Sequence, residues 1–273
     1  MPGERRVKPE KRQAEIVSLL RAMQRELTVD EIANQFGTSA LTVRRDLDAL
    51  VESGVILRTY GGCIIRSGLG DAYQKQVARN FRLKQAIGIA AANVVKSGET
   101  VLIDDGSTTF HLATNLESRA PVTVVTNSIA VIPALARCRG IQLEILGGLY
   151  NRDTNFVGGS LSERLLEMLY FDSVFVGADA IDSSGKCMVH SPDVARLTQV
   201  MLKRAAHRFL LADHTKAGGS SHVIYGTLSD FDLWVTTVGI SSRLLTAFRK
   251  MTTVKEVDWE TPDSSETESG SEF

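Results

Sequence analysis

The chain has 273 residues, of which 43% are hydrophobic and 23% are charged, and its formal net charge is -1 at pH 7. This length predicts a small domain joined to one of about 150–200 residues, and the balanced charge excludes a protein that binds polyanions through bulk charge alone. Three scattered cysteines, and the lack of an apolar run long enough to span a membrane, favour a reducing, cytoplasmic setting with no metal, cofactor or membrane partner.

The first 65 residues predict a small domain of three helices and a wing. Residues 9–23 have apolar side chains at helical spacing. Two short helices follow, and the spacing of Ala33, Gly37 and Val43 is typical of a helix-turn-helix, with Gly37 at the turn. Residues 55–65, VILRTYGGCII, predict a two-stranded wing. Such a motif places its second helix in the DNA major groove.

The second helix of this motif has two chemically different faces. Periodicity of about 100° per residue predicts one buried face, formed by Val43, Leu47, Leu50 and Val51. The outward charges are Arg44 and Arg45, followed by Asp46, Asp48 and Glu52. Because phosphate repels the later acids, the N-terminal end should enter the groove, with Thr38 or Ser39 as its cap. The residues expected to contact DNA are Thr38, Ser39, Leu41, Thr42, Arg44, Arg45, Arg58 and Tyr60.

An arginine pair on a helical hairpin is also compatible with an ordinary solvated surface. The turn spacing, the charge polarity and the wing would then have to coincide by chance, so DNA binding is the better interpretation.

The remainder of the chain predicts a larger α/β domain. Residues 66–80 are polar and contain glycine, which predicts a linker. Between residues 81 and 255, a helix at 83–96 precedes apolar runs that alternate with helical segments, which indicates a mostly parallel, doubly wound sheet. The predicted strands are 100–104, 122–126, 141–146, 173–178, 207–212 and 232–238. Residues 256–273 contain seven acids and predict a disordered tail.

Small polar residues follow several of these strands. Ligands of open α/β sheets bind beyond the carboxyl ends of the strands, and such loops offer hydroxyl and backbone N–H groups to an anion. The candidate ligand-binding residues are Asp104, Asp105, Gly106, Ser107, Thr108, Thr109, Thr126, Asn127, Ser128, Gly147, Gly148, Arg152, Asp179, His190 and Lys216. Each alone is compatible with a turn, a helix cap or a solvated side chain, but their recurrence at successive strand ends favours an anion or sugar site.

Seven motifs in order resemble the DeoR family of bacterial sugar-catabolism repressors. They are KPEKRQAEIVSLL (8–20), LTVRRDLDALVESGVILRTYGG (41–62), VLIDDGSTT (101–109), TVVTNS (123–128), EILGG (144–148), VFVGADAID (174–182) and LLADHTK (210–216). The resemblance covers nearly all of residues 8–240. It implies a winged helix-turn-helix domain, an effector domain built like ribose-5-phosphate isomerase, double-stranded operator DNA as a partner, and a phosphorylated sugar or sugar alcohol as effector, with aspartates receiving its hydroxyls.

Two further expectations concern assembly and catalysis. One short recognition helix contacts few base pairs, so we expect a homodimer or homotetramer on paired half-sites. A sugar-phosphate isomerase is the rival class, and it needs a carboxylate base. Relatives commonly have E-A-E-V-K after the GAD loop, whereas this chain has VARLT (194–198), with Arg196 in place of the second acid and Thr198 in place of the lysine. We therefore expect no catalysis, and Arg196 is either an anion-binding residue or an exposed helical one.

Overall fold

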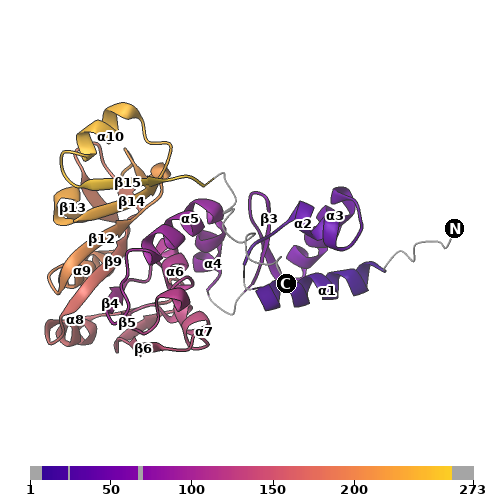
Figure 1. Cartoon of the computed structure of the whole chain (residues 1–273), viewed down its shortest axis with the longest axis horizontal. Helices are drawn as coiled ribbons and strands as arrows, with labels where there is room; N and C mark the ends of the chain where they lie inside the picture. Colours follow the sequence, from indigo (N-terminus) through magenta and orange to yellow (C-terminus); the bar gives the residue numbers. More distant parts are fainter. Residues whose placement is uncertain (1–7, 24, 67–69, 260–273) are drawn as a thin grey trace, which may run out of the picture. The chain divides into compact units, whose positions relative to one another are not determined.

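The computed structural model describes residues 8–23, 25–66 and 70–259 (Figure 1). The chain divides into two compact units, Met1–Phe81 and Arg82–Phe273, and each has its own hydrophobic core. Within the described ranges, every helix falls short of the length and apolar character needed to cross a bilayer.

The N-terminal unit is the predicted helix-turn-helix with a wing. Its elements are α1 (Pro9–Met23), β1 (Leu27–Thr28), α2 (Val29–Gln35), α3 (Ala40–Glu52), β2 (Ile56–Arg58), β3 (Gly62–Ile65) and α4 (Asp71–Ala78). The wing strands β2 and β3 pair antiparallel, and the short β1, which the sequence did not predict, adds a third strand beside β3. Gly37 has a φ of 56° in the turn between α2 and α3, as expected for a residue without a Cβ.

The buried face of α3 differs from the prediction at two positions. Val43, Leu47 and Leu50 are buried, but Val51 is exposed and Asp46 is buried. On a helix, Val51 lies about 80° from Val43, whereas Asp46 lies about 60° from it on the opposite side. The buried arc therefore extends towards Asp46, where a charged partner from α1 makes burial of the carboxylate possible.

Helix α4 lies inside residues 66–80, for which the sequence predicted only a polar linker. Tyr73 and Val77, one turn apart on this helix, are buried. Two large apolar residues, with two alanines beside them, gave too weak a periodic signal to predict a helix. The assignment of domain boundaries at residues 65, 80 and 255 stays a prediction.

The C-terminal unit is built on one parallel seven-stranded sheet with the order β15-β14-β12-β9-β4-β5-β6. The strands are β4 (Thr100–Ile103), β5 (Val122–Thr126), β6 (Ile141–Ile145), β9 (Phe171–Gly177), β12 (Ala205–Leu211), β14 (Leu233–Thr237) and β15 (Thr253–Val257). The six predicted strands are confirmed. The edge strand β15 was missed, and it includes Glu256 and Val257 of the predicted tail; residues 260–273 of that tail lie outside the described part of the chain.

Both faces of this sheet are covered. Leu102 and Val174 point into one core, and their neighbours Val101, Ile103 and Phe175 point into the other. The helices are α5 (Phe81–Ala92), α6 (Ser107–Ala113), α7 (Ile132–Leu135), α8 (Ser160–Glu167), α9 (Pro192–Leu202) and α10 (Ser242–Phe248). Figure 1 shows α8 and α9 on one side of the strands and α5 and α6 on the other. This is the predicted doubly wound α/β architecture.

Two small antiparallel sheets were not predicted. One is a hairpin of β7 (Leu149–Asn151) and β8 (Phe156–Gly158), and the other contains β10 (Ala180–Ile181), β11 (Lys186–Val189) and β13 (Val223–Thr227). Strands of two to five residues lack a clear alternating pattern. Both small sheets follow strands of the main sheet and contribute residues to its carboxyl edge.

Candidate functional site

A buried carboxylate lies where the strand order of the main sheet reverses. From the neighbours β4 and β9, the chain proceeds outward to β6 on one side and to β15 on the other. Asp104 follows β4, and its Oδ2 accepts a hydrogen bond of 2.7 Å from the backbone N–H of Gly177, at the end of β9. Its Oδ1 accepts from the hydroxyl of Thr109 at 2.7 Å and from the N–H of Gly106 at 2.9 Å. Open α/β sheets bind their ligands at such a switch point.

The loop after β5 adds a cluster of buried polar atoms. Asn127 Nδ2 donates to Asp105 Oδ1 at 3.3 Å. The turn of the β7–β8 hairpin lies against this loop, because the N–H of Ile129 donates to the carbonyl of Asn155 at 3.1 Å. Asn127 Oδ1, Ser128 Oγ and Asn155 Nδ2 are buried without a hydrogen-bond partner among the described residues. Leaving each of these buried atoms without a hydrogen-bond partner costs roughly 1–3 kcal/mol of folding free energy. A polar ligand that supplies the missing partners can therefore bind at this cluster.

A third carboxylate, Asp179, follows β9. Its Oδ2 accepts a hydrogen bond of 2.9 Å from the backbone N–H of His190 and lies 2.9 Å from the Nδ1 of the same residue. The Tyr225 hydroxyl, from β13, donates to the carbonyl of Gly177 at 2.7 Å. Sequence reasoning identified Asp179 and His190. It missed Tyr225, because only the tertiary fold brings β13 to the end of β9.

Two of these carboxylates, Asp104 and Asp105, have raised pKa values. Burial raises the pKa of Asp104 above its usual range, and the charge of Asp179 raises it further. Loss of solvent and then the neighbouring Asp104 raise the pKa of Asp105 to about 7. Burial also raises the pKa of Tyr225 well above its usual value. The two carboxylates are stabilised by hydrogen-bond donors or by a proton, and the hydroxyl groups of a sugar are suitable donors.

Some predicted ligand residues have internal roles in the structure. The Thr126 hydroxyl donates to the carbonyl of Ile103 at 2.6 Å and accepts from the N–H of Ser128 at 3.0 Å, so it holds the end of β5 to β4. Ser107 and Thr108 are buried in the first turn of α6.

The double glycine after β6 has a packing role. A Cβ on Gly148 would lie 2.4 Å from the carbonyl oxygen of Gly158 and 2.4 Å from Ser162 Oγ. The Ser162 hydroxyl, from α8, donates to the carbonyl of Gly147 at 2.6 Å. Glycine is therefore needed for the β7–β8 hairpin and α8 to approach closely. Ligand binding by these glycines stays a prediction.

The two basic candidates lie in different loops. Arg152 is exposed in the hairpin turn, and Lys216 is half-buried in a 3-10 turn after β12. Asp213, at the start of that turn, is fully buried; its Oδ1 accepts from the N–H of Thr215 at 3.0 Å, and its Oδ2 has no partner among the described residues. Sequence reasoning passed over Asp213, although an acid directly after an apolar strand is the same signal that identified Asp104.

Arg196 was expected to be either an anion-binding residue or an exposed helical one, and its ion pair with Glu163 decides between them. Its Nε donates to Glu163 Oε2 of α8 at 2.8 Å, and the side chain is largely exposed, so it is an exposed helical residue paired within the chain. Thr198 is buried, and its hydroxyl donates to the carbonyl of Val194 within α9. Neither position holds a carboxylate base.

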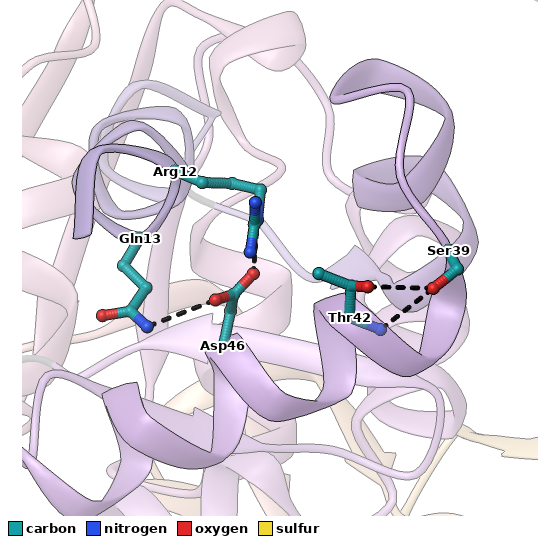
Figure 2. A network of polar contacts seen from close by, with 5 residues as sticks. All are labelled: Arg12, Gln13, Ser39, Thr42 and Asp46. Atoms are coloured by element: carbon teal, nitrogen blue, oxygen red, sulfur yellow. Dashed lines mark hydrogen bonds and ion pairs between the residues drawn. The ribbon is translucent and has the colours of Figure 1, made fainter. Parts of the chain in front are cut away.

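In the N-terminal unit, Ser39 caps α3. Its Oγ accepts from the N–H of Thr42 at 3.2 Å and lies 2.9 Å from the Thr42 hydroxyl (Figure 2). Of the two predicted candidates, Ser39 is therefore the cap, whereas Thr38 donates its N–H to the carbonyl of Ala33. The first turn of α3 contains no acidic residue, which leaves its N-terminus suited to phosphate.

The predicted DNA-contacting side chains are mostly exposed. Leu41, Arg44 and Arg45 are exposed on α3, and Tyr60 is fully exposed at the tip of the wing. Arg58 lies in the wing with its Nε 3.9 Å from Asp48 Oδ1, a contact too long and too exposed to neutralise it fully.

A buried ion pair connects α1 to α3. Arg12 Nε lies 2.5 Å from Asp46 Oδ2, and Gln13 Nε2 donates to Asp46 Oδ1 at 3.2 Å (Figure 2). The two charged side chains are 9% and 4% exposed. Because both charges are removed from water, the pair restricts how α3 is seated on α1.

A helix-turn-helix unit followed by an α/β unit with a polar switch-point site defines a regulator that binds DNA and senses a small molecule. Family models agree with this class: the DeoR-like helix-turn-helix domain matches residues 12–67, and the DeoR C terminal sensor domain matches residues 79–237. The chain belongs to the DeoR family of transcriptional regulators.

Individual relatives have similar lengths. The lactose phosphotransferase system repressor of Lactococcus lactis subsp. lactis is 31% identical, over 85% of this chain and 92% of the relative. The HTH-type transcriptional repressor GlcR of Bacillus subtilis is 31% identical, over 83% and 88%. Among solved structures, ribose 5-phosphate isomerase A from Methanocaldococcus jannaschii is 18% identical with a TM-score of 0.38, covering 50% of this chain and 55% of that one.

Ionisation of Asp105 should make the stability of the C-terminal unit depend on pH. Its pKa is about 7 in the folded chain and about 3.9 when unfolded, so the folded state binds more protons between these values. Its contribution to stability is complete below about pH 4 and is lost as the pH rises through 7. Thermal unfolding across this range should show Asp105→Asn with a shallower fall in Tm than the parent chain. Equal slopes would contradict the raised pKa.

Removing one partner of the Arg12–Asp46 pair should destabilise the N-terminal unit strongly. Asp46→Leu leaves a buried guanidinium without this carboxylate, which should cost about 3–5 kcal/mol, whereas Arg12→Met combined with Asp46→Leu should recover most of that loss. Hydrogen exchange of α1 and α3 amides in the full chain measures both. The exposed control Asp48→Leu should change stability by less than about 1 kcal/mol; an equal effect of Asp46→Leu and Asp48→Leu would refute the buried pair.

Proposed function

We propose that the protein is a cytoplasmic repressor of a carbohydrate uptake or catabolic operon, controlled by a phosphorylated sugar or sugar alcohol. The observation that supports this most is that one chain contains both a helix-turn-helix, with exposed arginines near the N-terminus of α3, and a switch-point site with unsatisfied polar groups. Relatives named as repressors of the lactose phosphotransferase system and as GlcR support the carbohydrate assignment.

Operator DNA is bound through the N-terminal end of α3 and the wing. The exposed Arg44 and Arg45 lie within two turns of the Ser39 cap, and the acids Asp48 and Glu52 follow further from the DNA. Arg58 and Tyr60 contact the backbone or the adjacent groove, and Leu41 and Thr42 contact base edges or the sugar-phosphate backbone.

The effector lies over the carboxyl ends of β4, β5 and β9. Asp104, Asp105 and Asp179 would repel a phosphate, so they accept the sugar hydroxyls, and the buried atoms of Asn127 and Ser128 gain partners from the same ligand. The phosphate lies towards the Ser107 and Thr108 turn and the cation of Lys216. The remaining residues proposed to contact the effector are Gly106, Thr109, Thr126, Gly147, Gly148, Arg152 and His190.

Regulation rather than isomerisation is the activity of this site. Arg196 pairs with Glu163, and Thr198 is bonded within its own helix, so the residues that replace the expected acid and lysine provide no base. The protein works as a homodimer or homotetramer, because paired half-sites give the specificity that one recognition helix lacks.

Arginines of α3 should determine operator affinity. A base-contacting arginine lost in Arg44→Ala or Arg45→Ala should cost roughly 1–3 kcal/mol on the operator and relax its specificity, whereas an arginine that contacts only phosphate should weaken all sequences alike. Mobility shifts with the chain's own upstream region and with unrelated DNA, at two salt concentrations, distinguish these cases. Lys250→Ala, an exposed charge loss in the other unit, is the control. Unchanged binding by both arginine variants would overturn the proposed DNA surface.

Effector response should depend on the strand-end loops but not on α3. A thermal-shift screen of phosphorylated pentoses, hexoses and polyols against their unphosphorylated forms should give stabilisation by one or a few phosphorylated compounds. Thr108→Ala and Lys216→Ala should abolish that shift and leave DNA binding near normal, because neither residue lies in the DNA-binding unit. An effector changes DNA binding only through its different affinities for the DNA-binding and the non-binding arrangement of the protein. Equal stabilisation by unphosphorylated sugars, or none by any compound, would refute the phosphate assignment.

A further inference from the structure

Exposed apolar side chains are concentrated in one segment of the C-terminal unit. Fifteen large apolar side chains are exposed in the described part of the chain, and seven of them lie between residues 145 and 170: Ile145, Leu149, Tyr150, Leu161, Met168, Leu169 and Tyr170. Leu149 and Met168 are each 81% exposed. Exposed apolar groups that are scattered singly need no explanation, but a contiguous group with polar residues at its edge is typical of a protein–protein contact.

The helix α8 gives this group its geometry. Leu161, Leu165 and Met168 have the spacing i, i+4 and i+7, so they form one stripe along the helix. Leu161 and Met168 are exposed, Leu165 between them is half-buried against the core, and Ser162 and Leu166 are buried. A Cβ on Gly147 would lie 3.6 Å from Leu165 Cδ1 and 3.7 Å from Leu161 Cδ2. The stripe is therefore adjacent to the start of the β7–β8 hairpin and its exposed Leu149.

The charges beside the stripe are self-complementary. Arg164 and Glu167 are both exposed and lie on the same flank of α8, three residues apart. If two copies of α8 pack antiparallel about a two-fold axis near Leu165, Leu161 comes opposite Met168 of the partner subunit. The same axis brings Arg164 opposite Glu167 of the partner subunit. A two-fold contact uses one patch on both copies, and this patch satisfies that condition.

We propose that the α8 surface, formed by Leu149, Leu161, Arg164, Leu165, Glu167 and Met168, is the contact between two copies of this chain. It rests on the proposed function, because paired half-sites need two chains. Burial of the stripe supplies the affinity, and the two arginine–glutamate contacts at the edge fix the antiparallel direction.

Charge reversal tests the pairing directly. In the full chain, Arg164→Glu or Glu167→Arg alone places like charges opposite each other and should raise the dissociation constant of the dimer about tenfold or more. The double variant restores opposite charges and should return close to the parent value. Met168→Glu should weaken assembly by at least about 30-fold. The matched control is Val238→Glu, at another exposed apolar side chain, and it should not change assembly.

Light scattering and sedimentation over a range of concentrations measure the assembly, and thermal unfolding confirms that each variant is folded. Binding of Met168→Glu to a single half-site should equal that of the parent chain, while binding to the paired site falls. A parent chain that is monomeric at micromolar concentration, unchanged assembly in Met168→Glu, or a double reversal no better than the single ones would overturn the α8 contact. If the α8 variants leave assembly unchanged while sequence-preferring DNA binding persists, the α8 contact is wrong and the proposed function stands. A monomeric parent chain also contradicts the homo-oligomer of the proposed function, and a parent chain without sequence-preferring DNA binding refutes that function itself.

Discussion

One buried carboxylate organises the C-terminal unit. Asp104 stands where the strand order reverses, and its oxygens are held by donors from the loop after β4 and from the end of β9. These bonds close the loop into the first turn of α6 and connect the two halves of the sheet. Because a buried carboxylate is costly unless it is fully bonded, the surrounding backbone is constrained to present N–H groups at this place. In the neighbouring loops, Asn127 Oδ1, Ser128 Oγ and Asn155 Nδ2 remain buried without a partner among the described residues.

The N-terminal unit depends on a comparable restriction. A core of aliphatic side chains packs α1, α2 and α3 but is tolerant of small rotations, since apolar contacts are not directional. The pairing of Arg12 with Asp46 is directional, and rotating α3 would separate the charges in a site with little water. The exposed arginines of α3 thereby keep one orientation relative to the wing. A recognition helix needs this more than it needs extra stability, because base contacts require exact placement.

Unsatisfied and strained groups make the switch-point site a place for a polar ligand. Burial, and then the charge of neighbouring carboxylates, raises the pKa of Asp104 and of Asp105, and a ligand that donates hydrogen bonds to them relieves this. Tyr150 of the hairpin donates to Asn155, whose amide nitrogen belongs to the same unsatisfied cluster. The hairpin thus connects the site to the exposed α8 surface. A ligand that orders the hairpin would act on both, which is how one binding event can bias an assembly.

The sequence by itself determined the helix-turn-helix, the wing, six of seven strands and the polar loops at their ends, because each depends on local periodicity and turn chemistry. It did not determine that Asp46 is buried and Val51 exposed, because a helix can be seated in more than one way until a partner such as Arg12 chooses. Nor could it indicate β15, Tyr225 or Asn155, whose places depend on segments distant in the chain. The packing role of Gly148 was equally hidden, since a glycine after a strand indicates a turn and not which helix approaches it. Local rules determine elements, and only the tertiary structure decides which of their faces meet.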